Sequence, residues 1–127
     1  MILGIDLGKK TTGIASSSGT IATPLATIKH SSLDQSVEKI SKVANEEQAK
    51  IVIIGFVEGK IKVYFQDFAK KFKEKNPQIE IVMQDETLTS RQALETMINM
   101  GISKSKRKAK EHEIAASIIL QEYLDSK

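Results

Sequence analysis

Three carboxylates stand where the sequence predicts buried strands to end. Asp6 lies in the apolar and glycine-rich opening GIDLGKKTTGIA, residues 4–15, and Asp85 and Glu86 follow the apolar segment IEIVM, residues 79–83. Burying a lone carboxylate costs free energy, so we expect a cation to bind between these carboxylates and neutralise their charge. Oxygen ligands without thiols favour Mg²⁺ or Mn²⁺. Two such ions about 3.5–4 Å apart can activate a water and stabilise the leaving oxygen of a phosphodiester.

A purely structural interpretation of the same acids is open. Asp6 could end its strand in a turn, and Asp85 and Glu86 could begin the next helix. For each acid alone this structural interpretation is slightly favoured over the metal site. The two positions taken together favour the site, because the carboxyl ends of neighbouring parallel strands meet at one edge of a sheet. The expectation therefore requires that the first and last strands be neighbours.

Five strands and four helices are predicted to position these acids. Alternating or continuous apolar runs separated by short turns predict strands over 2–7, 12–17, 20–28, 50–56 and 79–83, with Pro24 placing the third at an edge or a break. Apolar residues at helical spacing predict helices over about 31–47, around Phe65–Phe72, from 89 onward, and over about 108–125. His30, just before the first helix, is expected to be exposed.

This element order predicts one α/β domain over residues 1–127. Three antiparallel strands are followed by strands that the chain reaches through helices, as parallel pairing requires. We expect a mixed five-stranded sheet with helices on both faces. The Phe and Met residues at helical spacing are expected to be core rather than a cofactor site.

Composition narrows the classes of function. The chain has 127 residues and a net charge of +3. It contains no cysteine, which excludes a disulfide framework and a zinc–thiolate site. No apolar stretch is long enough to cross a membrane, and no secretory signal pattern is present, so we expect a cytoplasmic protein. Basic residues cluster in a predicted loop, SKSKRKAK, residues 103–110, which suits a polyanion. A solvated loop without a partner is the alternative.

The chain resembles the YqgF/RuvX family over essentially its whole length. These are small bacterial proteins with an RNase H-like fold, described as Holliday junction resolvases or pre-16S rRNA nucleases. The family's glycine-rich opening is matched by Gly4, Asp6, Gly8 and Lys10. Its Asp-Glu-Arg-Leu-Thr segment is matched by Asp85, Glu86, Leu88 and Thr89, with Thr87 where arginine is usual, and its basic loop by Lys106, Arg107 and Lys108.

The resemblance implies that Asp6 and Glu86 are metal-binding catalytic acids, with Asp85 as a secondary candidate. It also implies that a basic set binds nucleic acid, either structured RNA or branched DNA. That set consists of Lys10, Lys104, Lys106, Arg107 and Lys108.

The sequence departs from the family pattern at the last helix. The family's third acid opens that helix, and alignment on Ile114, Ala115 and Ala116 puts His112 in its place. His112 lies on the helix face predicted to pack inward, where a neutral imidazole can ligate a divalent ion or accept a proton from water. Imidazole suits Mn²⁺ better than the harder Mg²⁺. Glu111 could reach the site instead after a small rotation of the helix.

Three functions remain open on this basis. The first is a metal-dependent endonuclease on structured nucleic acid, with pre-16S rRNA processing ahead of Holliday junction resolution. The second is a nucleic-acid-binding module that has lost catalysis, which His112 suggests. The third is an ATPase of the actin and sugar-kinase type, because GIDLGKKT resembles a phosphate loop, but that fold needs two such domains. No heptad seam establishes a dimer, so we expect a monomer or a weak homodimer.

Overall fold

The computed structural model describes residues 1–56, 62–85 and 104–126 of the 127-residue chain. Five strands lie in one sheet: β1 (Ile2–Asp6), β2 (Thr11–Ser17), β3 (Thr23–Lys29), β4 (Ile51–Phe56) and β5 (Glu80–Asp85). The described helices are α1 (Leu33–Glu46), α2 (Lys62–Lys75) and α4 (Lys104–Asp125). The helix predicted from residue 89 lies outside the described residues. Within the described ranges, no helix is long and apolar enough to cross a membrane.

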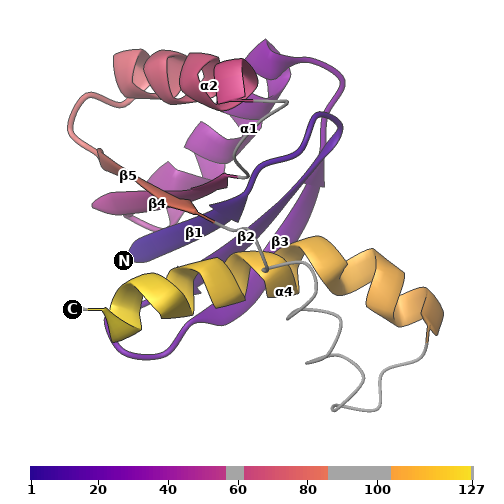
Figure 1. The fold of residues 1–127 in the computed structure, drawn as a ribbon. Coiled ribbons are helices and arrows are strands. Elements are labelled where there is room, and N and C mark those ends of the chain that lie inside the picture. Colours follow the sequence, from indigo (N-terminus) through magenta and orange to yellow (C-terminus); the bar gives the residue numbers. More distant parts are fainter. Residues whose placement is uncertain (57–61, 86–103, 127) are drawn as a thin grey trace.

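The sheet has the strand order β3-β2-β1-β4-β5 (Figure 1). Strand β1 pairs antiparallel with β2 and parallel with β4, and β4 pairs parallel with β5. The predicted mixed five-stranded sheet is thus confirmed. The condition that the first and last strands be neighbours is not met, because β4 lies between them. Periodicity shows where strands are, but it does not show which of them pair.

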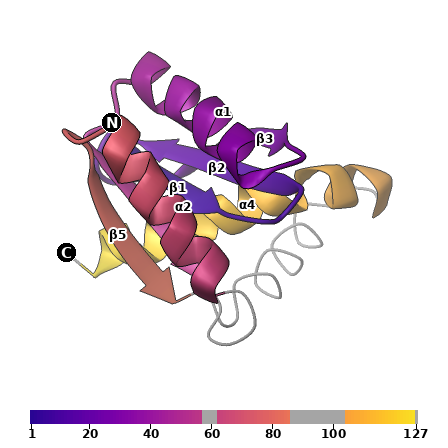
Figure 2. The ribbon, with the colours of Figure 1, turned by 90° about the horizontal axis from the view of Figure 1, so that it is seen from above.

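Helices cover both faces of the sheet, as predicted. Figure 2, which looks down on the molecule, shows α1 and α2 in front of the strands and α4 behind them. Alternation along β1 divides the core accordingly: Leu3 and Ile5 join the cluster that packs under α1 and α2. That cluster includes Phe65, Phe68 and Phe72 of α2, all fully buried, so the predicted core role of these phenylalanines is confirmed. On the other face, Ile53 packs against α4.

Strand β3 lies at an edge of the sheet and carries an irregularity, as Pro24 predicted. Ile14 pairs with Ala26, but Ala15 pairs with Pro24, so Leu25 is the extra residue of a β-bulge. Proline has no N–H to donate to a ladder and is tolerated at such positions.

The ends of two helices can be compared with the sequence. Ser32 caps α1 by accepting a hydrogen bond from the Gln35 backbone N–H, and the Gln35 side chain accepts one from the Ser31 N–H in return. In a capping box the N-cap residue itself donates the second hydrogen bond, whereas here Ser31, one residue earlier, donates it. The basic segment 103–110, predicted as a loop, is instead helical from Lys104 onward. Lysine and arginine are good helix formers, so clustered charge was a poor reason to predict a loop.

Helix α4 lies directly on the backbone of β1 and β2. A Cβ atom on Gly13 of β2 would collide with the His112 carbonyl group of α4. A Cβ on Gly4 of β1 would lie 2.8 Å from the Ala116 carbonyl oxygen and 2.6 Å from the Leu120 Cβ. Glycine at these two positions therefore allows the helix axis to approach the sheet more closely than any side chain would permit.

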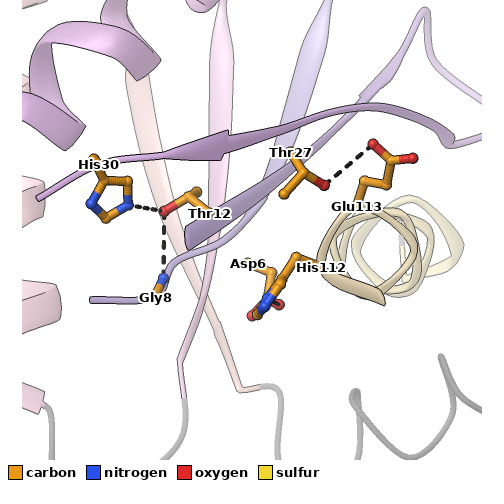
Figure 3. Close-up of polar contacts among 7 residues, drawn as sticks. All are labelled: Asp6, Gly8, Thr12, Thr27, His30, His112 and Glu113. Carbon is orange, nitrogen blue, oxygen red and sulfur yellow. Dashed lines mark hydrogen bonds and ion pairs between the residues drawn. The ribbon is translucent and has the colours of Figure 1, made fainter. Parts of the chain in front are cut away.

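The turn between β1 and β2 is held by side chains of β2, of α2 and of the connection between β3 and α1. The Gly8 N–H donates to Thr12 Oγ1 at 3.4 Å, and the Tyr64 hydroxyl of α2 donates to the Gly8 carbonyl oxygen at 3.1 Å. Thr12 Oγ1 also lies 2.8 Å from His30 Nε2 (Figure 3). Hydrogen bonds therefore fix both the N–H and the carbonyl group of Gly8, two residues after Asp6.

His30 is buried, with 5% of its surface exposed, so the prediction of an exposed loop residue is wrong. Its partner Thr12 is 18 residues away in the chain, and no local pattern indicates that contact. Its Nδ1 atom is buried with no partner among the described residues. Burial, and secondarily the charge of Lys39, lowers the pKa of His30 from its usual value, so the folded chain favours the neutral imidazole.

We expect alanine to be tolerated less well at Gly13 than at Gly4. The new methyl of Gly13→Ala meets helix backbone, which cannot move without shifting α4, so the free energy of unfolding should fall by about 3 kcal/mol or more. Gly4→Ala meets a side-chain atom and a carbonyl at longer range and should cost about 1–3 kcal/mol. Urea unfolding of the two variants measures both values. Equal or negligible losses would show that α4 does not lie this close to β2.

The burial of His30 predicts a pH-dependent contribution to stability. At pH 8, His30→Ala should lower the free energy of unfolding by about 1–3 kcal/mol, through the lost hydrogen bond and the cavity. Since the folded-state pKa lies below the unfolded value of 6.5, the advantage of wild type over His30→Ala is complete above pH 6.5 and shrinks as the pH falls through this value.

His30→Gln provides the matched control for this measurement. Its amide can still reach Thr12 but does not titrate, so its stability should stay close to that of wild type at pH 8. The difference in the free energy of unfolding between His30→Gln and His30→Ala should then be the same at every pH. If wild type instead gains stability over His30→Ala as the pH falls, the imidazole is not held neutral.

Candidate functional site

Asp6 ends β1 at the centre of the sheet. Its neighbours in register are Gly13 of β2 and Gly55 of β4, so no side chain stands beside it on either adjacent strand. Only 14% of the Asp6 side chain is exposed. A carboxylate in such a place needs a charged or hydrogen-bonding partner. The flanking glycines leave room for that partner on the face that α4 covers.

The partner in this structure is His112. Its Nδ1 lies 3.2 Å from Asp6 Oδ2, and Figure 3 shows the two side chains directed toward each other from α4 and β1. The contact follows from the packing of the helix, because the His112 backbone rests on Gly13, which is the register partner of Asp6. The predicted inward face of this helix is therefore confirmed.

Asp6 changes the titration of His112. The hydrogen bond from the imidazole to the carboxylate raises the pKa of His112 above its usual value, against the opposing effect of burial, and the charges of Asp6 and Glu111 add to the rise. In this arrangement the pair favours an imidazolium that shares its proton with Asp6.

The two glutamates beside His112 have different surroundings. Glu113 turns toward β3, where the Thr27 hydroxyl donates to its Oε2 at 3.4 Å (Figure 3). Glu111, the secondary candidate, is close enough for its charge to act on His112, but the described contact with Asp6 is made by His112. The sequence assignment of His112, rather than Glu111, to this position agrees with that geometry.

The other predicted acids are less fully described. Asp85 ends β5 and pairs with Phe56 of β4, so its backbone lies at the same end of the sheet as Asp6. Because β4 intervenes, the two strand ends are separated by two strand spacings, about 10 Å. Glu86 lies outside the described residues.

The predicted nucleic-acid contacts lie at two places. Lys10 is exposed in the turn between β1 and β2. The others begin α4, one and two turns before His112: Lys104, Lys106, Arg107 and Lys108. Their backbone position at the start of this helix puts them on the chain segment that leads directly into the site.

The residues at the site fit a divalent ion in part. Adjacent ligands about 2.1 Å from an ion and at right angles to each other are about 3 Å apart, which is close to the 3.2 Å between Asp6 Oδ2 and His112 Nδ1. No group of three or more potential ligands occurs within residues 1–56, 62–85 and 104–126. Glu86, the second predicted metal ligand, lies outside these ranges. The oxygen and imidazole donors of Asp6 and His112 suit Mn²⁺ at least as well as Mg²⁺.

Sequence reasoning missed the residues that support the site. Thr12, His30 and Tyr64 hold the turn after Asp6, and no local signal links them. It also missed Gln84, which shares a row with Asp6, since Asp6 pairs with Gly55 and Gly55 pairs with Gln84. Knowledge of the strand order would have found Gln84, because residues in register on adjacent strands point to the same face.

Similarity to solved structures agrees with this topology. The fold matches Thermus thermophilus RuvC in complex with a Holliday junction substrate with a TM-score of 0.63 and 14% identity, covering 98% of this chain and 94% of that one. It matches the fowlpox virus Holliday junction resolvase with a TM-score of 0.61 and 15% identity, covering 99% of both chains. Identities this low establish the fold, which is RNase H-like as predicted.

The sequence comparisons say more about the family of this chain than the comparison of folds does. A protein of Thermoanaerobacter pseudethanolicus named "Putative pre-16S rRNA nuclease" is 40% identical, with 98% of this chain and 96% of that protein covered. A protein of the same name from Aster yellows witches'-broom phytoplasma is 37% identical, with 97% and 87% covered. The family model RuvX, described as Holliday junction resolvase, matches residues 1–126. The chain therefore belongs to the RuvX family, as its opening and its Asp85–Glu86 segment predicted.

Proposed function

We propose that this protein is a divalent-metal-dependent endonuclease that cleaves structured nucleic acid, with precursor 16S rRNA as its substrate. The observation that carries the proposal is the contact between Asp6 and His112 at the carboxyl end of β1, 3.2 Å apart in an RNase H-like sheet. The names of the full-length relatives favour the rRNA precursor over other nucleic acids.

Each residue has a distinct part in this proposal. Asp6 supplies the central carboxylate ligand, and Glu86 supplies a second carboxylate. Once its imidazole has lost the proton that Asp6 stabilises, His112 supplies the third donor or accepts a proton from the attacking water. A bound Mg²⁺ or Mn²⁺ would activate that water and stabilise the oxygen that leaves phosphorus. Water adds to phosphorus, the phosphorus–oxygen ester bond breaks, and the leaving oxygen takes up a proton.

Holliday junction resolution is the second candidate. It is favoured by the description of the matching family model and by the resolvases that share the fold. A four-way junction offers two symmetric cuts, so this activity would require two copies of the chain. A binding module without catalysis is the third candidate, and it depends on whether His112 replaces the usual acid. The experiments below separate these possibilities.

Removal of the Asp6 charge should abolish cleavage while leaving the fold intact. Asp6→Asn keeps the shape of the side chain but weakens ion binding, so cleavage should fall by about 10²-fold or more. The measurement is cleavage of a pre-16S rRNA hairpin and of a four-way DNA junction, each with Mg²⁺ or Mn²⁺. Asp34→Asn is the matched control, because Asp34 is an exposed residue of α1 paired with Lys71.

The outcomes of this experiment are separable. Cleavage of the hairpin by wild type and Asp34→Asn, but not by Asp6→Asn, would support the proposal. Cleavage of the junction alone would favour the resolvase. Normal cleavage by Asp6→Asn would refute the site, and binding without cleavage by wild type would identify a binding module.

Replacement of His112 by the usual acid should change the preference for metal. A carboxylate binds the harder Mg²⁺ better than an imidazole does, so His112→Asp should raise the ratio of the rate in Mg²⁺ to the rate in Mn²⁺. A relative stabilisation of about 1.4 kcal/mol would change this ratio by about 10-fold. His112→Ala should lower the rate in both metals. A loss in Mg²⁺ on substitution by Asp would show that the imidazole has a role no carboxylate fills.

A further inference from the structure

The segment from the end of β1 to the start of α1 has no acidic residue. Between Asp6 and Asp34 the sequence contains no aspartate or glutamate, but it contains Lys9, Lys10 and Lys29. These 27 residues, 7–33, form the turn after the site, strands β2 and β3, and the connection to α1. All the charged side chains of the β2–β3 hairpin and its flanking turns are therefore positive.

The fold gathers these lysines at the Asp6 end of the sheet. Strand β2 begins there and β3 ends there, because Thr11 pairs with Lys29 while Asp6 pairs with Gly13. The His30 N–H donates to the Lys10 carbonyl oxygen at 2.9 Å, which closes this end of the hairpin. From α1, Lys39 Nζ donates to the Lys29 carbonyl oxygen at 2.7 Å. We call Lys9, Lys10, Lys29 and Lys39 the cationic rim.

The charge of the cationic rim is not neutralised within the described ranges. All four lysines are exposed, and none makes an ion pair with a described residue. Two described acids on neighbouring helices have other partners: Asp34, in the first turn of α1, is bound by Lys71 at 2.7 Å, and Glu113 of α4 accepts from the Thr27 hydroxyl. The lowered pKa of His30, to which Lys39 contributes, is consistent with positive potential here.

The cationic rim extends from the face of the Asp6–His112 pair around the end of the sheet to the opposite face. Lys29 follows Thr27 by two residues in β3, so alternation places it on the face where Thr27 contacts Glu113 of α4. His112 approaches from α4, whereas Lys39 belongs to α1 and the turn carrying Lys9 and Lys10 is tied to α2 through Tyr64 and Gly8. Figure 2 shows α1 and α2 on one face and α4 on the other. A polyanion that reaches Asp6 can therefore continue around the end of the sheet onto the cationic rim.

We propose that the cationic rim binds the phosphate backbone of a second segment of the same nucleic acid, the duplex arm next to the strand held at Asp6. This rests on the proposed function. Lysines are point charges that position phosphates, without the planar fork by which arginine reads a guanine edge. No arginine or aromatic side chain belongs to the rim, so it recognises the backbone and shape of the arm rather than its bases.

Direct binding measurements test this surface independently of catalysis. The test protein is the triple variant Lys9→Gln, Lys29→Gln and Lys39→Gln, with Lys10 left in place because it belongs to the site predicted from sequence. The matched control is the triple variant Lys50→Gln, Lys70→Gln and Lys75→Gln, which removes the same charge from exposed positions elsewhere. Lys50 and Lys75 lie near the starts of β4 and β5, at the opposite end of the sheet.

Binding to a labelled pre-16S rRNA hairpin and a four-way DNA junction is measured in chelator over a series of salt concentrations. On duplex DNA each lost phosphate contact lowers the slope of log affinity against log salt by about 0.9, so the junction slope should fall by about 2–3 in the test variant. Its affinity near 0.1 M salt should fall about 10- to 100-fold. The control should keep the wild-type slope, and arginine at the three rim positions should restore it.

Each outcome decides the proposal. A loss of slope in the test variant but not in the control supports it, and equal behaviour of the two variants overturns it. Failure of wild type to bind either nucleic acid would overturn both this proposal and the proposed function. Lys39 bonds to backbone, so the triple variant could lose stability; the single variants Lys9→Gln and Lys29→Gln then give the same test, each with an expected slope change of about 0.9.

Discussion

The close approach of α4 to the backbone of β1 and β2 is the constraint on which the site depends. Gly13 and Gly4 leave no Cβ between the sheet and the helix, and the His112 carbonyl lies where a side chain on Gly13 would stand. Farther along α4, Gln121 accepts from the Ala22 N–H and donates to the Thr20 carbonyl, which fastens the helix to the turn between β2 and β3. The helix is thus set at a fixed distance, and that distance brings the imidazole to Asp6.

Much of the fold could be predicted because its signals are local. The apolar run at 51–56 and the edge position of Pro24 each depend on residues close in sequence, and each was confirmed. The strand order could not be predicted, because the placement of β4 between β1 and β5 depends on how helical crossovers return to the sheet. The helical start of α4 was missed for another reason: a run of lysines has high helix propensity as well as high charge.

Asp6 and His112 could be singled out from the sequence, but their contact could not be predicted. Asp6 is conspicuous because a carboxylate within an apolar strand has no local reason to be there, and His112 is conspicuous because helical spacing puts it on a buried face. Their distance depends on Gly13, whose importance cannot be inferred until the helix is placed over it. The turn behind Asp6 depends likewise on Thr12 of β2, His30 of the connection between β3 and α1, and Tyr64 of α2.

The two histidines show how position determines the role of one residue type. His112 lies beside a carboxylate, so its pKa is raised and it favours the charged form that Asp6 stabilises. His30 is buried against a neutral hydroxyl with Lys39 nearby, so its pKa is lowered and it favours the neutral form. If His30 were charged, it would add to the cationic rim but would need an acceptor for its buried Nδ1, which has none among the described residues. The neutral imidazole avoids that cost, so His30 can hold the turn through Thr12 and leave the positive charge to the exposed lysines around it.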